Sequence, residues 1–118
     1  MLPLSLLDNN HDCIYNIIMK YIQFEWDKNK EHSNIDKHGI DFEEAKTAFY
    51  DSNARVIYDP EHSEIEDRYI LMGLSYKLRL ITVSHCYRKK QEIIRIISAR
   101  KASKSETEQY YLFKGQSL

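Results

Sequence analysis

The sequence has few of the residues that mark several specialised classes of protein. It contains two cysteines, Cys13 and Cys86, which form no CxxC pair, so neither a zinc site nor a disulfide framework is expected. No apolar run approaches the roughly 20 residues that are needed to span a bilayer. The first residues, MLPLSLLDNN, have no basic segment and only a short apolar run, which is untypical of a secretory signal peptide. We therefore expect a cytoplasmic protein without a cofactor, a metal ion or a membrane partner.

Proline and glycine are also scarce, with two prolines and three glycines in 118 residues. The chain has no internal repeat, no low-complexity tract and no Pro/Gly-rich linker. What is present is the composition of a globular protein, with 42% hydrophobic and 30% charged residues. A chain of this length and composition predicts one domain with a core of modest size.

The formal net charge of −1 hides an asymmetry along the chain. Residues 25–67 contain thirteen acidic and five basic residues. Residues 76–104 contain nine basic residues and one acidic residue, Glu92. The basic segment predicts a local cationic surface. The alternative is that the two segments pair with each other across the fold, since surface charges are common.

The first half of the domain predicts one strand and two helices. Residues 20–26, KYIQFEW, are rich in strand-forming residues, and Asp27 then serves as the N-cap of a polar helix that ends at Gly39. Asp41 and Glu44 form a capping pattern at the start of a second helix. The residues that line one face of this second helix are Phe42, Ala45, Ala48 and Phe49.

The second half predicts an antiparallel β-meander followed by a helix. The expected strands cover residues 54–58, 68–75, 79–86 and 92–99. Ser103 and Glu106 form a capping box that starts a terminal helix ending near Phe113. The fold class is therefore α+β, with the order β-α-α-β-β-β-β-α. Short connections favour antiparallel pairing, with helices on one face of the sheet and the other face partly open.

Three segments resemble the BrnT family of ribonuclease toxins, the toxin halves of bacterial type II toxin–antitoxin systems. They are FEWDKNKEHSNIDKHGIDFEEA (24–45), VIYDPEHSEIEDRYILMGLS (56–75) and IIRIISARKASKSETEQYY (93–111). The most specific pieces are FEWD, NIDKHGIDFEEA, DRYILMGLS and RIISARKAS, in this order and at these spacings. The resemblance covers about residues 19–113 and implies a RelE-like fold, in which a small antiparallel sheet is flanked by helices.

The resemblance also divides the chain near Met19. Members of the family tend to begin just before the first strand, and MKYIQFEWD begins in this manner. We therefore expect a single BrnT-like toxin domain over residues 19–118. Residues 1–18 are then an N-terminal extension, either an artefact of start-site choice or a dispensable segment, although their apolar residues could instead pack on the sheet.

The activity that the resemblance implies is metal-independent cleavage of RNA, which inhibits translation and growth. In this reaction the 2′-hydroxyl attacks the adjacent phosphate, an acid and a base move protons, and cations stabilise the charged intermediate. The implied partner is a BrnA-like antitoxin, through which a toxin–antitoxin complex binds operator DNA. Two alternatives are a catalytically inactive antitoxin-binding module that acts only in autoregulation, and a general binder of single-stranded nucleic acid.

Arg100 and Lys101 are the first candidate site residues, because they lie where the last strand meets the last helix. A cation there is disfavoured by the helix dipole, which suggests that an anion is bound nearby. Arginine offers a planar fork for phosphate, and the helix that follows Ser103 adds backbone donors. We predict a phosphate site at this junction. The alternative is that Arg100 pairs with Glu25 or Asp27 and joins the sheet to a helix.

Arg95 and His85 are further candidates on the expected strands. Strict alternation places Arg95 on the same face as Ala99 and opposite Ile96, where it could contact phosphate or bridge to a neighbouring acid. The imidazole of His85 suits an acid or a base. However, His85 shares a face with Val83 and could equally be a hydrogen-bonded structural histidine.

Arg68 completes the predicted catalytic set of Arg100, Lys101, Arg95, His85 and Arg68. It opens the second strand of the meander and could reach the same site, or it could pair with Glu64 or Asp67. His38 precedes the helix-ending glycine, so it is interpreted mainly as a C-terminal capping residue. His62 has no partner in the sequence pattern, and no metal-binding spacing such as HExxH occurs.

Overall fold

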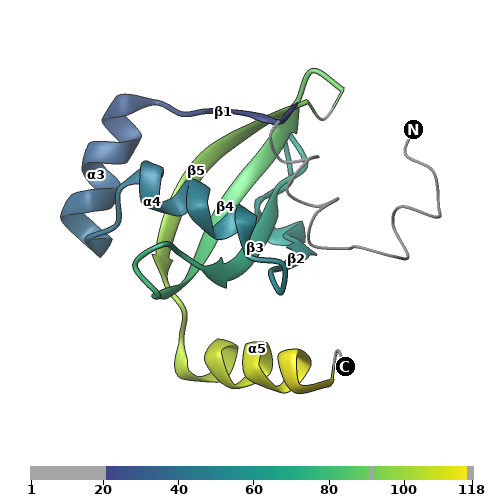
Figure 1. Ribbon diagram of the computed structural model, residues 1–118. Coiled ribbons are helices and arrows are strands. Elements are labelled where there is room, and N and C mark those ends of the chain that lie inside the picture. Colours follow the sequence, from purple (N-terminus) through teal and green to yellow (C-terminus); the bar gives the residue numbers. More distant parts are fainter. Residues whose placement is uncertain (1–20, 91, 117–118) are drawn as a thin grey trace.

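The structure is a computed structural model that describes residues 21–90 and 92–116 (Figure 1). Its strands are β1 (Gln23–Glu25), β2 (Arg55–Tyr58), β3 (Tyr69–Leu74), β4 (Leu80–Arg88) and β5 (Ile93–Lys101). Its helices are α3 (Lys28–His38), α4 (Phe42–Thr47) and α5 (Lys104–Gln116), with short 3-10 turns η1 (Ala48–Tyr50) and η2 (Pro60–His62). The α+β class and the order of the elements are confirmed. The predicted extension over residues 1–18 lies outside the described residues.

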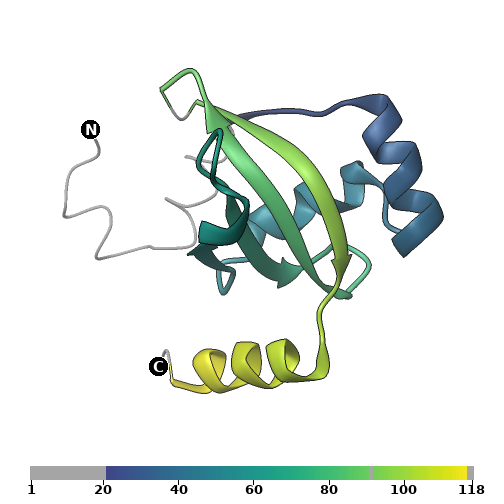
Figure 2. The ribbon, with the colours of Figure 1, turned by 180° about the vertical axis from the view of Figure 1, so that it is seen from behind.

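The five strands form one sheet in the order β1-β5-β4-β3-β2. Helix α4 lies on one face of this sheet, α3 lies beside the β5 edge, and α5 lies across one end of the sheet (Figure 1). Figure 2 shows the opposite face, where η2 lies in front of the sheet and α5 remains below it. The centre of this second face is open among the described residues, in agreement with the sequence prediction.

The ends of both early helices are set by the residues that were predicted to cap them. The carboxylate of Asp27 accepts hydrogen bonds from the backbone N–H groups of Asn29 and Lys30, at 2.7 and 3.1 Å. Gly39 ends α3 in the left-handed region, with φ of 69°. The carboxylate of Asp41 accepts from the backbone N–H of Glu44, at 2.7 Å. These local signals set where both helices begin and where α3 ends.

Strands β2 to β5 pair antiparallel as predicted, but β1 pairs parallel with β5. The chain leaves β1 through two helices, and the last strand of the meander returns beside β1 in the same direction. Because β1 is three residues long, its pairing with β5 stops at Arg95. Beyond that point the side-chain amide of Asn34 bonds both backbone groups of Ala99, at 2.9 Å each. Asn34 thus continues the ladder that β1 begins.

A β-bulge interrupts the pairing of β4 with β5. Ser84 pairs with Ser98, whereas the next residue of β4, His85, pairs with Ile96. Ile97 is therefore an extra residue without a cross-strand partner in this register. An extra residue of this kind reverses the facing of every side chain that follows it in the strand.

The bulge overturns the predicted facing of Arg95. Ile96 and Ala99 are both buried in the core although they are three positions apart. Arg95 precedes Ile96 and Arg100 follows Ala99, so both arginines lie on the open face of the sheet. The prediction that Arg95 shares a face with Ala99 is wrong, because it assumed strict alternation along the whole strand.

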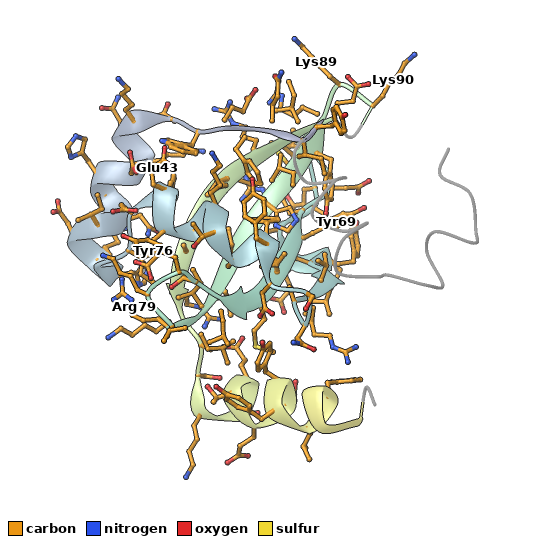
Figure 3. All side chains as sticks on the ribbon, viewed as in Figure 1. Glu43, Tyr69, Tyr76, Arg79, Lys89 and Lys90 are labelled. Atoms are coloured by element: carbon orange, nitrogen blue, oxygen red, sulfur yellow. The ribbon has the colours of Figure 1, made fainter. Side chains whose placement is uncertain are left out.

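Three basic residues of segment 76–104 form ion pairs with acidic residues of segment 25–67, as the alternative interpretation of the charge pattern proposed. They are Lys77 and Arg79, which pair with Glu44, and Arg95, which pairs with Glu25. The fully buried carboxylate of Glu44 accepts hydrogen bonds from the guanidinium of Arg79 and from Ser75 Oγ. Burial opposes ionisation of Glu44, but these donors outweigh it, so its pKa lies below the usual value. The pair ties the β3–β4 turn to α4, where Arg79 lies near Tyr76 and far from Lys89 and Lys90 at the other end of the sheet (Figure 3).

Tyr110 and Phe113 are two of the side chains that attach helix α5 to the rest of the fold. Tyr110 is buried, and its hydroxyl donates a hydrogen bond to the carboxylate of Asp51, at 2.6 Å. The same carboxylate oxygen accepts from the backbone N–H of Leu74, at 2.9 Å. Further along the helix, the guanidinium of Arg55 stacks over the ring of Phe113, at 3.5 Å from its centroid. These contacts fix α5 beside the open face.

Candidate active site

The open face of the sheet contains a hollow of about 350 Å³ between η2, the end of α3 and the strands β3, β4 and β5. Its volume falls in the range of roughly 300–1,000 Å³ that is usual for small-ligand sites. The polar side chains that line it are two arginines (Arg68, Arg100), two histidines (His38, His62), one carboxylate (Asp59) and three hydroxyls (Thr82, Ser84, Ser98). Two of the five predicted site residues therefore meet in one place.

Arg68 enters this hollow from the residue just before β3. Its backbone is fixed at both ends, since its carbonyl accepts from Asp59 N–H and its own N–H donates to Ser63 Oγ, at 2.9 Å each. In the described part of the chain, the carboxylate that pairs with it is that of Glu66, at 4.0 Å, rather than either of the two considered from the sequence. Among the described residues, its Nε is a buried nitrogen without a hydrogen-bond partner. A buried donor left unpaired costs about 1–3 kcal/mol, so this site favours an incoming acceptor.

Arg100 reaches the hollow from the end of β5, but it is already paired. Its two terminal nitrogens donate to the two carboxylate oxygens of Glu106, at 2.8 and 3.0 Å. Glu106 also closes the predicted capping box with Ser103, through backbone hydrogen bonds of 2.7 and 3.1 Å. The bonds from Arg100, helped by Ser103 and opposed by burial, lower the pKa of Glu106 to about 2. The chain itself thus supplies an anion at the junction, and the partner is neither of the acids considered from the sequence.

Lys101 and Arg95 lie outside the hollow. Lys101 is the last residue of β5 and pairs with the core residue Ile81, so its side chain leaves the strand on the face opposite to that of Arg100. Arg95 lies on the open face, where it donates a hydrogen bond of 2.6 Å to the carboxylate of Glu25 in β1. Bridging to a neighbouring acid was one of the two alternatives for Arg95, and it is the contact found.

His85 is also outside the hollow, and its side chain is fully buried. Its Nδ1 lies 3.0 Å from the carbonyl oxygen of Val83, and its Nε2 lies 3.2 Å from the hydroxyl of Tyr87. The ring also packs edge-on against Phe49, with centroids 4.9 Å apart. Burial lowers the pKa of His85, which favours the neutral imidazole. These contacts are those of a hydrogen-bonded structural histidine, which was one of the two interpretations of His85 from the sequence.

Sequence reasoning missed two residues that line the hollow, His62 and Asp59. They stand at either end of the η2 turn, and Nδ1 of His62 lies 2.8 Å from Oδ2 of Asp59. The signal was the segment DPEH, in which Pro60 starts a turn that brings residues three apart together. His38 lines the same hollow from the end of α3, where it had been assigned to capping.

Neither a metal centre nor a membrane span is found in the part of the chain that the structure describes. No group of three or more His, Cys, Asp or Glu side chains there lies close enough together to hold a metal ion. No helix among the same residues is long and apolar enough to cross a bilayer.

Comparison with known proteins bears directly on this site. A family model described as the ribonuclease toxin BrnT of type II toxin–antitoxin systems matches residues 26–106. The chain belongs to the BrnT family. All residues of the hollow fall within the matched range, so the hollow is part of the BrnT domain itself. As a BrnT ribonuclease toxin of a type II system, the chain has RNA as its substrate class and an antitoxin as its partner.

A solved BrnT structure agrees with the fold. The crystal structure of the Brucella abortus ribonuclease toxin BrnT is 28% identical in sequence, with a TM-score of 0.54. The match covers 70% of this chain and 99% of that chain. No curated protein sequence matches the chain significantly. The predicted family and the α+β architecture are confirmed, and the RelE-like label stays a prediction.

Proposed function

We propose that this BrnT-family chain is a metal-independent endoribonuclease whose substrate phosphodiester binds in the hollow between Arg68 and Arg100. The observation that carries the proposal is the meeting of two guanidinium groups on the open face of the sheet, one of them with an unpaired buried Nε. Planar guanidinium groups bind phosphate through paired hydrogen bonds, and positive charge stabilises the pentacovalent intermediate.

The two arginines have different tasks in this proposal. Among the residues that the structure describes, Arg68 has no carboxylate closer than that of Glu66, at 4.0 Å, so its charge is available to the phosphate. Arg100 is oriented by Glu106 and contributes the donors that this carboxylate leaves free. The hydroxyls of Ser84 and Ser98 stand in one cross-strand pair and offer donors to the non-bridging oxygens.

The remaining predicted site residues take supporting roles. Arg95 holds β1 to β5 through Glu25, and His85 completes the core beside Tyr87. Lys101 is exposed at the end of β5, where it could meet RNA outside the hollow. None of these three has a position from which to act on a phosphate bound between Arg68 and Arg100.

A second, more apolar hollow of about 250 Å³ adjoins the first and shares Ile70 and Thr82 with it. Phe113 and Met72 contribute to its lining. Bases of single-stranded RNA gain free energy from contact with apolar and aromatic side chains. We assign this hollow to a base next to the cleaved phosphodiester, which would favour single-stranded substrates.

The partner and the setting follow from the same proposal. We infer that the antitoxin is BrnA-like and that the toxin–antitoxin complex binds operator DNA through the antitoxin rather than through this chain. The substrate is cellular RNA, so the site of action is the cytoplasm.

The test is induced expression with and without the antitoxin gene, followed by sequencing of cellular RNA ends. Growth arrest with new RNA ends, both reversed by the antitoxin, is the expected result. Cleavage by the purified protein should persist in EDTA. Arg68→Ala should lower cleavage by about a hundredfold or more, and Arg68→Lys should restore part of it, because lysine keeps the charge and loses the fork. Arg100→Ala should likewise abolish growth inhibition without unfolding the protein.

The control for both variants is Arg88→Ala, at the exposed end of β4. It removes a cation from the same basic segment without touching the hollow, so toxicity should be retained. A folded Arg68→Ala protein that cleaves RNA at the full rate would contradict the assignment of the hollow.

One observation favours a second candidate, the catalytically inactive antitoxin-binding module. Two guanidinium nitrogens of Arg100 already donate to the carboxylate of Glu106, as in an ion pair that serves only the structure. In that case the folded protein binds its antitoxin, causes no growth arrest and generates no new RNA ends.

A further inference from the structure

We propose that His62 is the general base of the hollow and that Asp59 positions it. The inference rests on the proposed ribonuclease function and adds to it the group that moves the proton. Cleavage of RNA without a metal needs a base near the 2′-hydroxyl, and neither arginine can serve as one because guanidinium stays protonated.

The geometry of the pair defines which ring nitrogen is available. Nδ1 of His62 lies 2.8 Å from Oδ2 of Asp59. An ionised carboxylate can only accept a hydrogen bond, so the shared proton belongs to Nδ1. In the neutral imidazole Nε2 then carries the lone pair, which is the tautomer that a base requires.

The side chains of Asp59 and His62 differ in solvent exposure, which suits their two different roles. The side chain of Asp59 is 13% exposed, whereas that of His62 is 62% exposed. The carboxylate is therefore fixed within the fold, and the imidazole extends toward solvent and lines the hollow. A carboxylate that orients an imidazole in this way is a recurring device for holding its tautomer and direction.

The backbone places this pair beside Arg68. The N–H of Asp59 donates to the carbonyl of Arg68, at 2.9 Å, where β2 and β3 approach each other before the loop. The hydroxyl of Ser63 then bridges the loop, donating to the carbonyl of Asp59 and accepting from the N–H of Arg68. Because these bonds close the loop, His62 is held near the arginine that is free to bind phosphate.

Other charged groups stand near His62. Arg68, Arg100 and His38 line the same hollow. On its outer side His62 also lines a shallow hollow of about 240 Å³. The carboxylates there are Glu61, Glu64 and Glu66. Apart from Asp59, the charged side chains on the hollow side of the imidazole are thus cationic or able to become so.

The proton transfer that follows from this arrangement is simple. Nε2 of His62 takes the proton of the 2′-hydroxyl while the oxygen–phosphorus bond forms and the phosphorus–O5′ bond breaks. The leaving 5′-oxygen takes a proton from water in the open hollow, and the imidazolium returns its own proton to the hydroxide that remains. The products are a 2′,3′-cyclic phosphate and a free 5′-hydroxyl.

The test is cleavage of a short single-stranded RNA by the purified protein over a range of pH. His62→Ala and His62→Gln should lower kcat by about 10²–10⁴-fold with little change in KM. Both should lose the limb of the pH–rate profile that reports this imidazole, and added imidazole should restore part of the activity of His62→Ala. Asp59→Asn should lower kcat less, since the ring stays in place with its tautomer no longer fixed.

The matched control is His32→Ala, which removes an exposed histidine of α3 that does not line the hollow. Its kcat and pH profile should equal those of the wild type. Unfolding curves of the His62 and His32 variants should coincide closely with that of the wild type, because both side chains are exposed.

Every other result of these experiments contradicts either the role of His62 or the ribonuclease function. Wild-type cleavage together with unchanged kcat and pH profile in His62→Ala overturns the role of His62 and leaves the ribonuclease function standing. Full activity of His62→Gln shows that a hydrogen bond to Asp59 suffices, and a rise in KM alone shows substrate binding. Either result overturns general-base catalysis by His62. A folded wild type that generates no cyclic phosphate ends refutes the proposed function, and this inference with it.

Discussion

Replacing Glu106 by Gln isolates the charge that faces Arg100. Glutamine has nearly the same shape and also serves in a capping box, so its side-chain oxygen can still accept from Ser103 N–H. What the substitution removes is the ion pair, in which both carboxylate oxygens of Glu106 accept from the guanidinium. The change in unfolding free energy therefore measures mainly that pair, with a smaller part from the charge beside Ser103 in the first turn of α5.

The magnitude follows from the pKa of Glu106, which falls from 4.5 to about 2. One pKa unit corresponds to about 1.36 kcal/mol, which sets an upper limit of about 3 kcal/mol. The side chains of Arg100 and Glu106 are 45% and 29% exposed, so solvent screens the pair. We expect about 1–2 kcal/mol at neutral pH.

The effect of pH on this stabilisation has a defined direction. Because the folded state lowers the pKa of Glu106, the stabilisation is fully present above pH 4.5 and is lost as the pH falls toward 2. Urea unfolding at pH 7 and at pH values down to 2 measures this directly. The variant should be less stable at pH 7 and should approach the wild type in acid.

Glu108→Gln, in the same helix, is the control, because Glu108 is exposed and belongs to no ion pair among the described residues. Equal stability of the wild type and Glu106→Gln at pH 7 would refute the reasoning. So would a difference between them that persists unchanged at pH 2.

Two further predictions concern buried side chains. Tyr110→Phe removes the 2.6 Å hydrogen bond to Asp51 and should lower the unfolding free energy by about 1–2 kcal/mol in thermal denaturation, whereas Tyr111→Phe, at an exposed position, should not. Burial lowers the pKa of His85 below 6.5, so the unfolded chain binds a proton that the folded chain resists, and stability should fall as the pH drops below 6.5. His85→Gln should remove this slope in urea unfolding between pH 7 and 5; an unchanged slope would contradict the assignment.

The parts of the fold that could be predicted from sequence are those set by neighbours along the chain. Asp27, Gly39 and the Ser103–Glu106 capping box act within a few residues of themselves, and each acts as predicted. The bulge at Ile97 could not be predicted in this way. It depends on how β5 aligns with β4, and an alternating apolar pattern does not report an inserted residue.

The candidate site was also only partly predictable from the sequence. Arg100 and Arg68, which line the hollow, were predicted as site residues because cations in or beside strands are conspicuous in a sequence. The partner of Arg100 was missed because charge counting pointed to distant acids, although Glu106 was already assigned to the capping box. His62 was missed because its possible role becomes visible only when Arg68 and Arg100 are seen to line the same hollow. They reach it from the strands, whereas His62 lies in η2.

The pairing of Arg100 with Glu106 also bears on ionic strength. RNA holds condensed cations, and binding releases one where a protein charge neutralises a phosphate, with a salt slope of about −0.7 per contact for single strands. The ion pair of Arg100 with Glu106 carries no net charge, so it releases few condensed cations when RNA binds. Within the hollow, Arg68 is then the residue that contributes to counterion release. RNA would be held here mainly by directed hydrogen bonds, and its affinity for the hollow would change little with salt.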